Sequence, residues 1–147
     1  MNQDIKEGIE IVHAIPSHEA FVYASWINNF ATNSWLAGAI KRRQFFKMHH
    51  AVIERILKRP TTVCLVATMK EDQDVAFGFL VAERAQEEAP TVHFCFVKED
   101  FRKMGIGRLL VQALDWDLNK CFYTHSVNDI NWCLSKFPGL KFYPYLA

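Results

Sequence analysis

The chain has 147 residues, of which 50% are hydrophobic, 14% aromatic and 22% charged, and its formal net charge is +1. This length predicts a single domain over residues 1–147, and the composition excludes disordered, collagen-like and low-complexity chains. The charge balance gives no support for a strongly basic nucleic-acid-binding protein. No apolar run approaches the roughly 20 residues of a membrane span, and the polar start does not resemble a secretory signal. The four cysteines lie far apart in apolar surroundings, so we expect reduced core residues of a cytoplasmic protein, without disulfides and without a metal site.

The first 60 residues predict one strand followed by two helices. Alternating Ile and Val residues over 8–15 predict the strand. Ser17 is the expected N-cap of a helix over 18–30, and the Asn- and Thr-rich stretch 28–34 is expected to break that helix. A second helix is expected over 43–58, before a proline.

The next segment predicts three strands and a helix. The β-branched runs 61–69 and 74–83 are joined by a charged turn, which is typical of an antiparallel hairpin. After a polar loop over 85–90, residues 91–97 are apolar in both alternating positions, so we expect a central strand that is covered on both faces. A helix is expected over 105–119.

The last 30 residues predict a short strand at 121–124, a short helix at 129–137 and a final strand at 141–145. The predicted order is therefore β-α-α-β-β-β-α-β-α-β. This order indicates an α/β fold, with a mixed sheet that carries helices on both faces.

The most informative stretch follows the predicted central strand and reads Arg102-Lys103-Met104-Gly105-Ile106-Gly107. It opens a helix, whose N-terminus presents unpaired N–H groups and a partial positive charge that suit a phosphate. Glycines let an anion approach the backbone closely. A Walker loop is excluded because its GxxxxGK[ST] pattern is absent, and a Rossmann loop is excluded because Leu110 takes the place of its third glycine.

This stretch resembles the acetyl-CoA signature Arg/Gln-x-x-Gly-x-Gly/Ala of the GNAT N-acetyltransferase superfamily, and the order of elements around it is similar as well. The resemblance implies a GNAT-like three-layer fold, with acetyl-CoA as the cosubstrate. It implies that backbone N–H groups hold the CoA pyrophosphate, and these belong to Arg102, Lys103, Met104, Gly105, Ile106, Gly107 and Arg108. It also implies that the pantetheine arm binds along Cys95, Phe96 and Val97 of the central strand. An N–H of Phe96 or Val97 would polarise the acetyl carbonyl, and Asn131 would contact CoA, unless it only caps the last helix.

The resemblance further implies direct acetyl transfer to a primary amine, with a general base and a general acid. Many members carry a carboxylate near the start of the central strand, where this sequence has Thr91. His93, expected on the same face as Cys95 and Val97, is one candidate base. Glu83 is the other candidate base. The structural alternatives are that His93 is a core histidine and that Glu83 is a solvated charge at the end of a strand.

The family's usual acid is a tyrosine, but its position falls on Ser135 in this sequence. Tyr143 and Tyr145 are therefore the candidate acids, unless they are packing aromatics or the thiolate leaves unaided. Two functions stay open: an acetyl-CoA-dependent N-acetyltransferase, and a catalytically weak or inactive GNAT-fold module that binds CoA or another protein. The sequence indicates no particular amine acceptor, small molecule or protein. The chain ends soon after the last predicted strand, which leaves room for a partner subunit in a homodimer to complete the acceptor site; neither a membrane nor a nucleic acid is expected as a partner.

Overall fold

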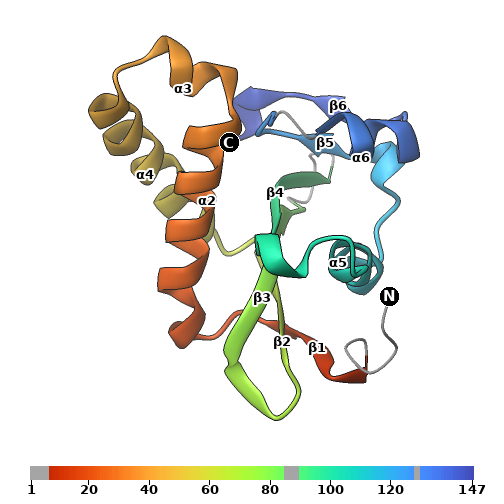
Figure 1. The fold of residues 1–147 in the computed structure, drawn as a ribbon. Coiled ribbons are helices and arrows are strands. Elements are labelled where there is room, and N and C mark those ends of the chain that lie inside the picture. Colours follow the sequence, from red (N-terminus) through yellow and green to blue (C-terminus); the bar gives the residue numbers. More distant parts are fainter. Residues whose placement is uncertain (1–6, 85–89, 128–129) are drawn as a thin grey trace.

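The computed structural model describes residues 7–84, 90–127 and 130–147, without the side chains of residues 37 and 130–132. Its centre is a six-stranded mixed sheet in which the strands follow chain order from β1 to β6 (Figure 1). The strands are β1 (Ile9–His13), β2 (Thr62–Met69), β3 (Asp72–Glu83), β4 (Thr91–Val97), β5 (Phe122–Tyr123) and β6 (Lys141–Phe142). The first four strands pair antiparallel, whereas β5 pairs parallel with both β4 and β6.

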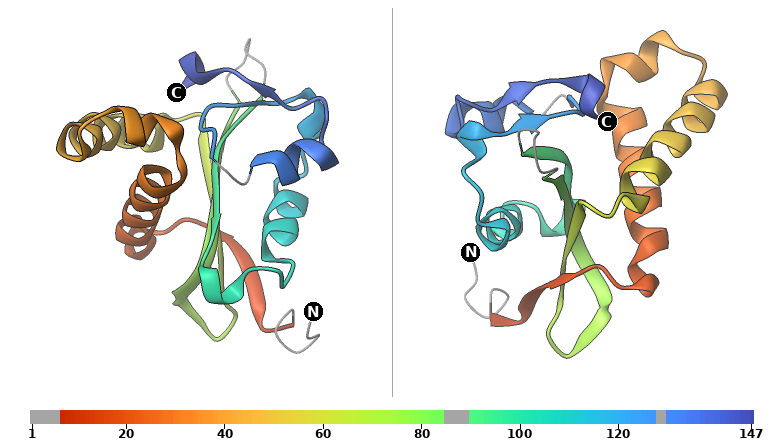
Figure 2. Two further views of the ribbon diagram at one scale, coloured as in Figure 1. Left: turned by 45° about the horizontal axis from the view of Figure 1, so that its top comes forward. Right: turned by 180° about the vertical axis from the view of Figure 1, so that it is seen from behind.

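Helices cover both faces of this sheet, as the three layers in Figure 2 show. One face carries α2 (Glu19–Asn33), α3 (Trp35–Ala39) and α4 (Arg42–Lys58), and the other carries α5 (Ile106–Leu114) and α6 (Ile130–Lys136). Short 3-10 turns complete the described chain: η1 (Pro16–His18), η2 (Glu99–Phe101), η3 (Leu118–Lys120) and η4 (Pro144–Leu146). The predicted α/β fold with helices on both faces is therefore confirmed.

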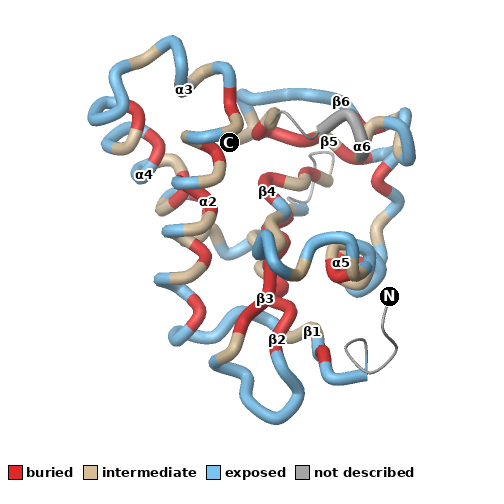
Figure 3. Tube along the Cα trace, viewed as in Figure 1, coloured by how far each residue is buried: buried red, intermediate tan, exposed pale blue. Residues whose placement is uncertain are grey.

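Strand alternation divides the core between the two faces. Val66 and Phe79 point to the α2 and α4 side, while their neighbours Leu65 and Leu80 point to the α5 side. Figure 3 shows the buried residues of β2 and β3 between the helix layers. No helix among the described residues combines the length and apolarity that a membrane crossing requires.

Two details near the first helices differ from the sequence-based expectation. Ser17 does not cap α2; it lies in η1, and its hydroxyl donates to Asp74 of β3 at 2.8 Å. Helix α2 also does not break at Asn28. It continues to Asn33, because the side chains of Asn28, Thr32 and Asn33 donate to the carbonyls four residues earlier and stay within the helix.

The helix expected over 105–119 is shorter in the structure. It ends at Leu114, because Asp115 has a φ of 57° in the left-handed region and caps the C-terminus. Most of the loop expected over 85–90 lies outside the described residues.

Candidate functional site

Strands β4 and β5 pair over only two positions, Thr91 with Phe122 and Val92 with Tyr123. The register of β4 against β3 shifts at this point, since Val81 lies opposite Phe94 while its neighbour Ala82 lies opposite Val92. His93 is therefore the extra residue of a β-bulge, and a bulge bends its strand and ends regular pairing. The ladder between β4 and β5 ends at Val92, and among the described residues the rest of β4, up to Val97, pairs in the sheet only with β3. We call this unpaired edge of β4 the gap.

Along β4, the backbone N–H and C=O groups of successive residues alternate between facing β3 and facing this gap. The Lys98 N–H donates to the Phe77 carbonyl at 2.8 Å, and residues of an antiparallel ladder alternate between facing the partner strand and facing away. Phe96 therefore faces β3, whereas Val97 faces the gap. The Val97 carbonyl accepts a hydrogen bond from Arg102 Nε at 2.9 Å, consistent with that phase. Of the two expected donors to an acetyl carbonyl, the geometry favours the Val97 N–H and not that of Phe96.

Cys95 lies in the middle of β4, yet its side chain is exposed. Surrounding protein nevertheless raises the pKa of its thiol to about 12, mainly through desolvation and further through the nearby Cys133 of α6. The thiol of Cys95 is therefore accessible to solvent and lies close to Cys133 of α6.

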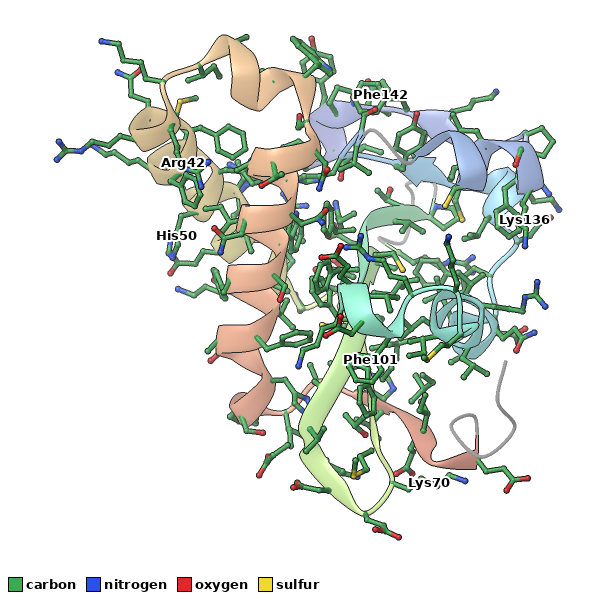
Figure 4. The ribbon with its side chains drawn as sticks, viewed as in Figure 1. Arg42, His50, Lys70, Phe101, Lys136 and Phe142 are labelled. Atoms are coloured by element: carbon green, nitrogen blue, oxygen red, sulfur yellow. The ribbon has the colours of Figure 1, made fainter. Side chains whose placement is uncertain are left out.

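The chain between β4 and α5 turns sharply. Phe101 of η2 packs its ring on Phe77, with 4.7 Å between centroids, and anchors this turn (Figure 4). Lys103 has a φ of 65° and Gly105 a φ of 84°, both in the left-handed region. Gly105 is the N-cap of α5 and gives it no side-chain cap.

The first turn of α5 leaves N–H groups open. The Leu109 N–H donates to the Gly105 carbonyl at 3.0 Å, so the preceding N–H groups of Ile106, Gly107 and Arg108 have no acceptor within the helix. The side chain of Ile106 is buried in the core, so only its backbone is available to a ligand.

Gly107 shows that the space above this turn is open. A Cβ added there would meet no atom within 4 Å, and its φ is not positive, so neither packing nor backbone conformation requires glycine. Arg102, Lys103 and Arg108 are exposed around the same turn. Open N–H donors, positive charge and unobstructed approach fit a diphosphate. Met104 is half-buried, and the Asn131 side chain lies outside the described part of the structure.

Glu83 and His93 contact each other on the other side of the sheet from α5. Glu83 Oε1 lies 3.0 Å from His93 Nε2 and 2.9 Å from Arg59 Nη1, and Oε2 accepts from the Thr61 hydroxyl at 2.6 Å. The expectation that His93 shares a face with Cys95 is wrong, because the bulge turns His93 toward Glu83. The side chain of His93 is fully buried.

Burial lowers the pKa of His93, although the hydrogen bond and charge of Glu83 oppose this shift. Burial alone would raise the pKa of Glu83, but hydrogen bonds from Thr61, His93 and Arg59 together hold it below its usual value. The pair therefore rests as a neutral imidazole beside a carboxylate at neutral pH.

Three further residues extend this pair, and no sequence signal pointed to them. Thr124 Oγ1 lies 2.9 Å from His93 Nδ1 and 2.8 Å from His125 Nδ1, and His125 Nε2 lies 2.9 Å from His49 Nε2. All three are buried. They come from α4 and from the segment after β5, so only the fold brings them together.

The two candidate tyrosines lie away from the gap. They follow the edge strand β6, which Figure 4 marks at Phe142, and β5 separates β6 from β4. The Tyr143 N–H donates to the Tyr123 carbonyl at 2.9 Å, and the Tyr145 side chain is 87% exposed. Ser135, at the family's tyrosine position, is exposed on α6.

A surface pocket of about 530 Å³ lies elsewhere, between β1, η1, α2 and β2. Its lining includes His13, Glu19 and Cys64. It includes no residue of the α5 turn and none of the hydrogen-bonded histidines His49, His93 and His125. The candidate functional site therefore consists of the unpaired edge of β4 and the turn that opens α5, with the Glu83–His93 pair on the opposite face of the sheet.

Comparison with known proteins identifies the family and proteins of the same fold. The family model described as the acetyltransferase (GNAT) family matches residues 24–128. Similar solved structures include YycN of Bacillus subtilis, with a TM-score of 0.64, 14% identity and coverage of 88% of this chain and 87% of that one. The acetyltransferase of Vibrio fischeri has a TM-score of 0.52, 16% identity and coverage of 78% and 93%.

A third similar structure is the aminoglycoside N-acetyltransferase AAC(6')-Iy in complex with CoA, with a TM-score of 0.50, 20% identity and coverage of 87% of this chain and 82% of that one. No curated protein matches the sequence closely enough to count as a relative. At these identities the solved structures show a shared fold, and the family match covers more than half of the sequence. The chain belongs to the GNAT acetyltransferase family.

Proposed function

We propose that this protein is an acetyl-CoA-dependent N-acetyltransferase that transfers an acetyl group directly to a primary amine. One observation carries the proposal: beyond Val92 the edge of β4 is unpaired among the described residues, and β4 runs on to Val97 and the turn that opens the N-terminus of α5. This arrangement offers a slot for an extended arm and a donor site for a diphosphate in one continuous path. The complex of AAC(6')-Iy with CoA, a protein of the same fold, supports CoA as the ligand.

The residues of this chain fit CoA in two places. The open N–H groups of Ile106, Gly107 and Arg108 would hold the pyrophosphate, with Arg102 and Lys103 adding positive charge. The stretch of β4 from the exposed Cys95 to the half-buried Val97 would hold the pantetheine arm through its gap-facing backbone. When bound, acetyl-CoA supplies an acetyl group on a thioester.

The chemistry then needs three contributions from the protein. Binding positions the amine against the thioester carbonyl. The Val97 N–H stabilises the negative charge that develops on the carbonyl oxygen. The Glu83–His93 pair receives the proton that the amine loses, while the thiolate leaves without an assigned acid because β5 separates Tyr143 and Tyr145 from the gap.

The test has two measurements. Acetyl-CoA should raise the melting temperature in a concentration-dependent way, and thiol release should appear with at least one member of a panel of aminoglycosides, polyamines, lysine peptides and peptide N-termini. Stabilisation without turnover on any amine would favour the alternative, a GNAT-fold binding module. Absence of stabilisation at millimolar acetyl-CoA would contradict the proposal itself.

A further inference from the structure

A continuous hydrogen-bonded chain of five side chains runs through the α2 and α4 side of the protein. It starts at Glu83 and passes through His93, Thr124 and His125 to His49, with each link between 2.8 and 3.0 Å. Among the described residues, no group of three or more ligating side chains could hold a metal ion. The three imidazoles thus form a chain and not a metal cage.

The carboxylate at one end fixes every donor in this chain. Ionised Glu83 only accepts, so His93 Nε2 carries a hydrogen and His93 Nδ1 accepts from the Thr124 hydroxyl. Because the Thr124 hydrogen is used there, Thr124 Oγ1 accepts from His125 Nδ1. His125 Nε2 then accepts from His49 Nε2, which leaves a lone pair on His49 Nδ1. Every hydrogen bond is donated toward Glu83.

The middle of the chain borders the gap. His93 Nδ1 lies 2.9 Å from Thr124 Oγ1, so the segment after β5 stays in side-chain contact with β4 where the ladder has ended. The Phe94 and His125 rings are 5.9 Å apart, and His125 also contacts Trp26 of α2 at 5.1 Å between ring centroids. The histidines therefore approach the gap from the face opposite α5 and its diphosphate site.

The two ends of the chain differ in their surroundings. At one end, the side chain of Glu83 is 12% exposed and pairs with the 28% exposed Arg59, so a proton can leave to solvent there. At the other end, the described residues give His49 Nδ1 no hydrogen-bond partner. Trp26 Nε1, on a residue that contacts His125, is buried and likewise finds no partner in the described part of the chain, so a polar atom of a ligand or a water would satisfy it.

We propose that His49, His125 and Thr124 carry the proton of the acceptor amine to the His93–Glu83 pair, with His49 Nδ1 as the receiving atom and Thr124 and His125 as positioning residues. This inference rests on the proposed N-acetyl transfer. As the N–C bond forms and the C–S electron pair leaves on the thiolate, the amine proton passes to His49 Nδ1. One hydrogen then shifts along each link, and the last reaches the Glu83 carboxylate and then water.

The charges around the chain suit this direction. Burial lowers the pKa of His49 to about 4 and holds the pKa of His125 well below its usual value, with His49 and His93 opposing a charge on His125 further. Arg59 opposes a charge on His93 as well. The imidazoles therefore pass a proton on and do not retain it, and Glu83 is the negatively charged group that receives it. The amine nitrogen becomes more acidic as its bond to carbon forms, so a chain of low basicity can still take the proton.

Thr124 offers the sharpest test, because its hydroxyl is the central link and the proposal gives it no contact with the substrate. Thr124→Val has nearly the same shape but interrupts the chain, and Thr124→Ser is the matched control that keeps the hydroxyl. We expect Thr124→Val to lower kcat at least tenfold with an unchanged KM for acetyl-CoA and a shifted pH profile. Thr124→Ser should stay within twofold of the wild type. A kcat and pH profile of Thr124→Val equal to the wild type would overturn the relay, while the N-acetyl transfer would stand.

A second measurement needs no turnover. Nitrogen-15 NMR of the histidine rings at pH 7 should show neutral imidazoles with hydrogen on Nε2 of His93, Nδ1 of His125 and Nε2 of His49. The opposite tautomer at any of the three would overturn the direction of transfer. His49→Gln keeps a donor toward His125 but has no accepting ring nitrogen, and it should lose kcat at least tenfold while the His93 tautomer is retained. A wild-type protein that releases no thiol with any amine would overturn the proposed function, and the catalytic use of the relay with it.

Discussion

Replacement of Gly107 by glutamate should have opposite effects on the free and the ligand-bound protein. Gly107 lies in the first turn of α5 with an ordinary φ and open space around its Cα. Gly105 is a poorer choice, because its φ of 84° would strain any other residue. A side chain at 107 therefore changes what approaches the helix without disturbing the fold.

The expected magnitudes follow from that position. Loss of a helical glycine stabilises a protein by up to about 1 kcal/mol, and an acidic residue in the first turn adds about 0.3–1 kcal/mol. The free Gly107→Glu protein should thus melt higher, by up to about 3–8 °C at roughly 2–4 °C for each kcal/mol. A carboxylate about 4 Å from a phosphate charge costs about 4 kcal/mol near a protein surface, which is roughly a thousandfold in affinity.

Differential scanning fluorimetry with and without acetyl-CoA measures both effects. At a hundred times its Kd, acetyl-CoA should stabilise the wild type by about 2.7 kcal/mol and leave Gly107→Glu unchanged. Gly107→Ala is the matched control, since it removes the glycine without adding charge; it should gain stability in the free state and keep most of the ligand response. A Gly107→Glu protein that responds to acetyl-CoA like the wild type would refute the diphosphate site.

Three further predictions concern the gap and the buried chain. Cys95→Trp should abolish acetyl-CoA binding measured by calorimetry yet leave the melting temperature nearly unchanged, because the Cys95 side chain is exposed on β4. Cys95→Ser is its control, and unaltered binding by the tryptophan variant would exclude the pantetheine path. Glu83→Gln should reduce kcat at least tenfold without changing acetyl-CoA affinity, and a kcat equal to the wild type would remove Glu83 as the proton acceptor. The pKa of His49 is lowered from 6.5 to about 4 in the folded protein, so the unfolded chain binds more protons between these values and stability should fall as the pH drops below about 6.5, by about 3 kcal/mol near pH 4. Urea denaturation from pH 7 to 4 should show a smaller loss for His49→Gln, and equal slopes for the two proteins would contradict the burial of a neutral imidazole.

Much of the fold could be predicted from the sequence because its signals are local. The hairpin of β2 and β3 and the amphipathic α4 follow from runs of residues whose period is visible in the chain. Helix α2 was predicted too short because Asn28 and Asn33 are typical of loops, whereas here their side chains bond backward within the helix. Such a choice between loop and helix depends on what the rest of the helix buries, which composition does not show.

The diphosphate site and the backbone donor on β4 also differ in how local their sequence signals are. The diphosphate half depends on consecutive residues around Gly105 and Gly107, so a motif could predict it. The choice between Phe96 and Val97 as backbone donor depends on the hydrogen-bonding phase against β3, which the Lys98–Phe77 contact determines. Nothing in residues 91–97 themselves encodes that phase.

The proton-transfer half could not be predicted, because one extra residue decides it. A regular strand would place His93 on the face of Cys95, toward the CoA side, and would let β4 continue beside β5. The bulge at His93 does the opposite in both respects: it turns the imidazole toward Glu83, and the pairing with β5 ends there. The same bulge therefore ends the pairing with β5, which leaves the gap for the acetyl donor, and links His93 to the other histidines. The last of these contacts joins His125 to His49, which are 76 residues apart in the sequence and meet only because α4 packs on this face. Donor site and proton path are thus joined at one position of β4, and a change in the bulge should disturb both together.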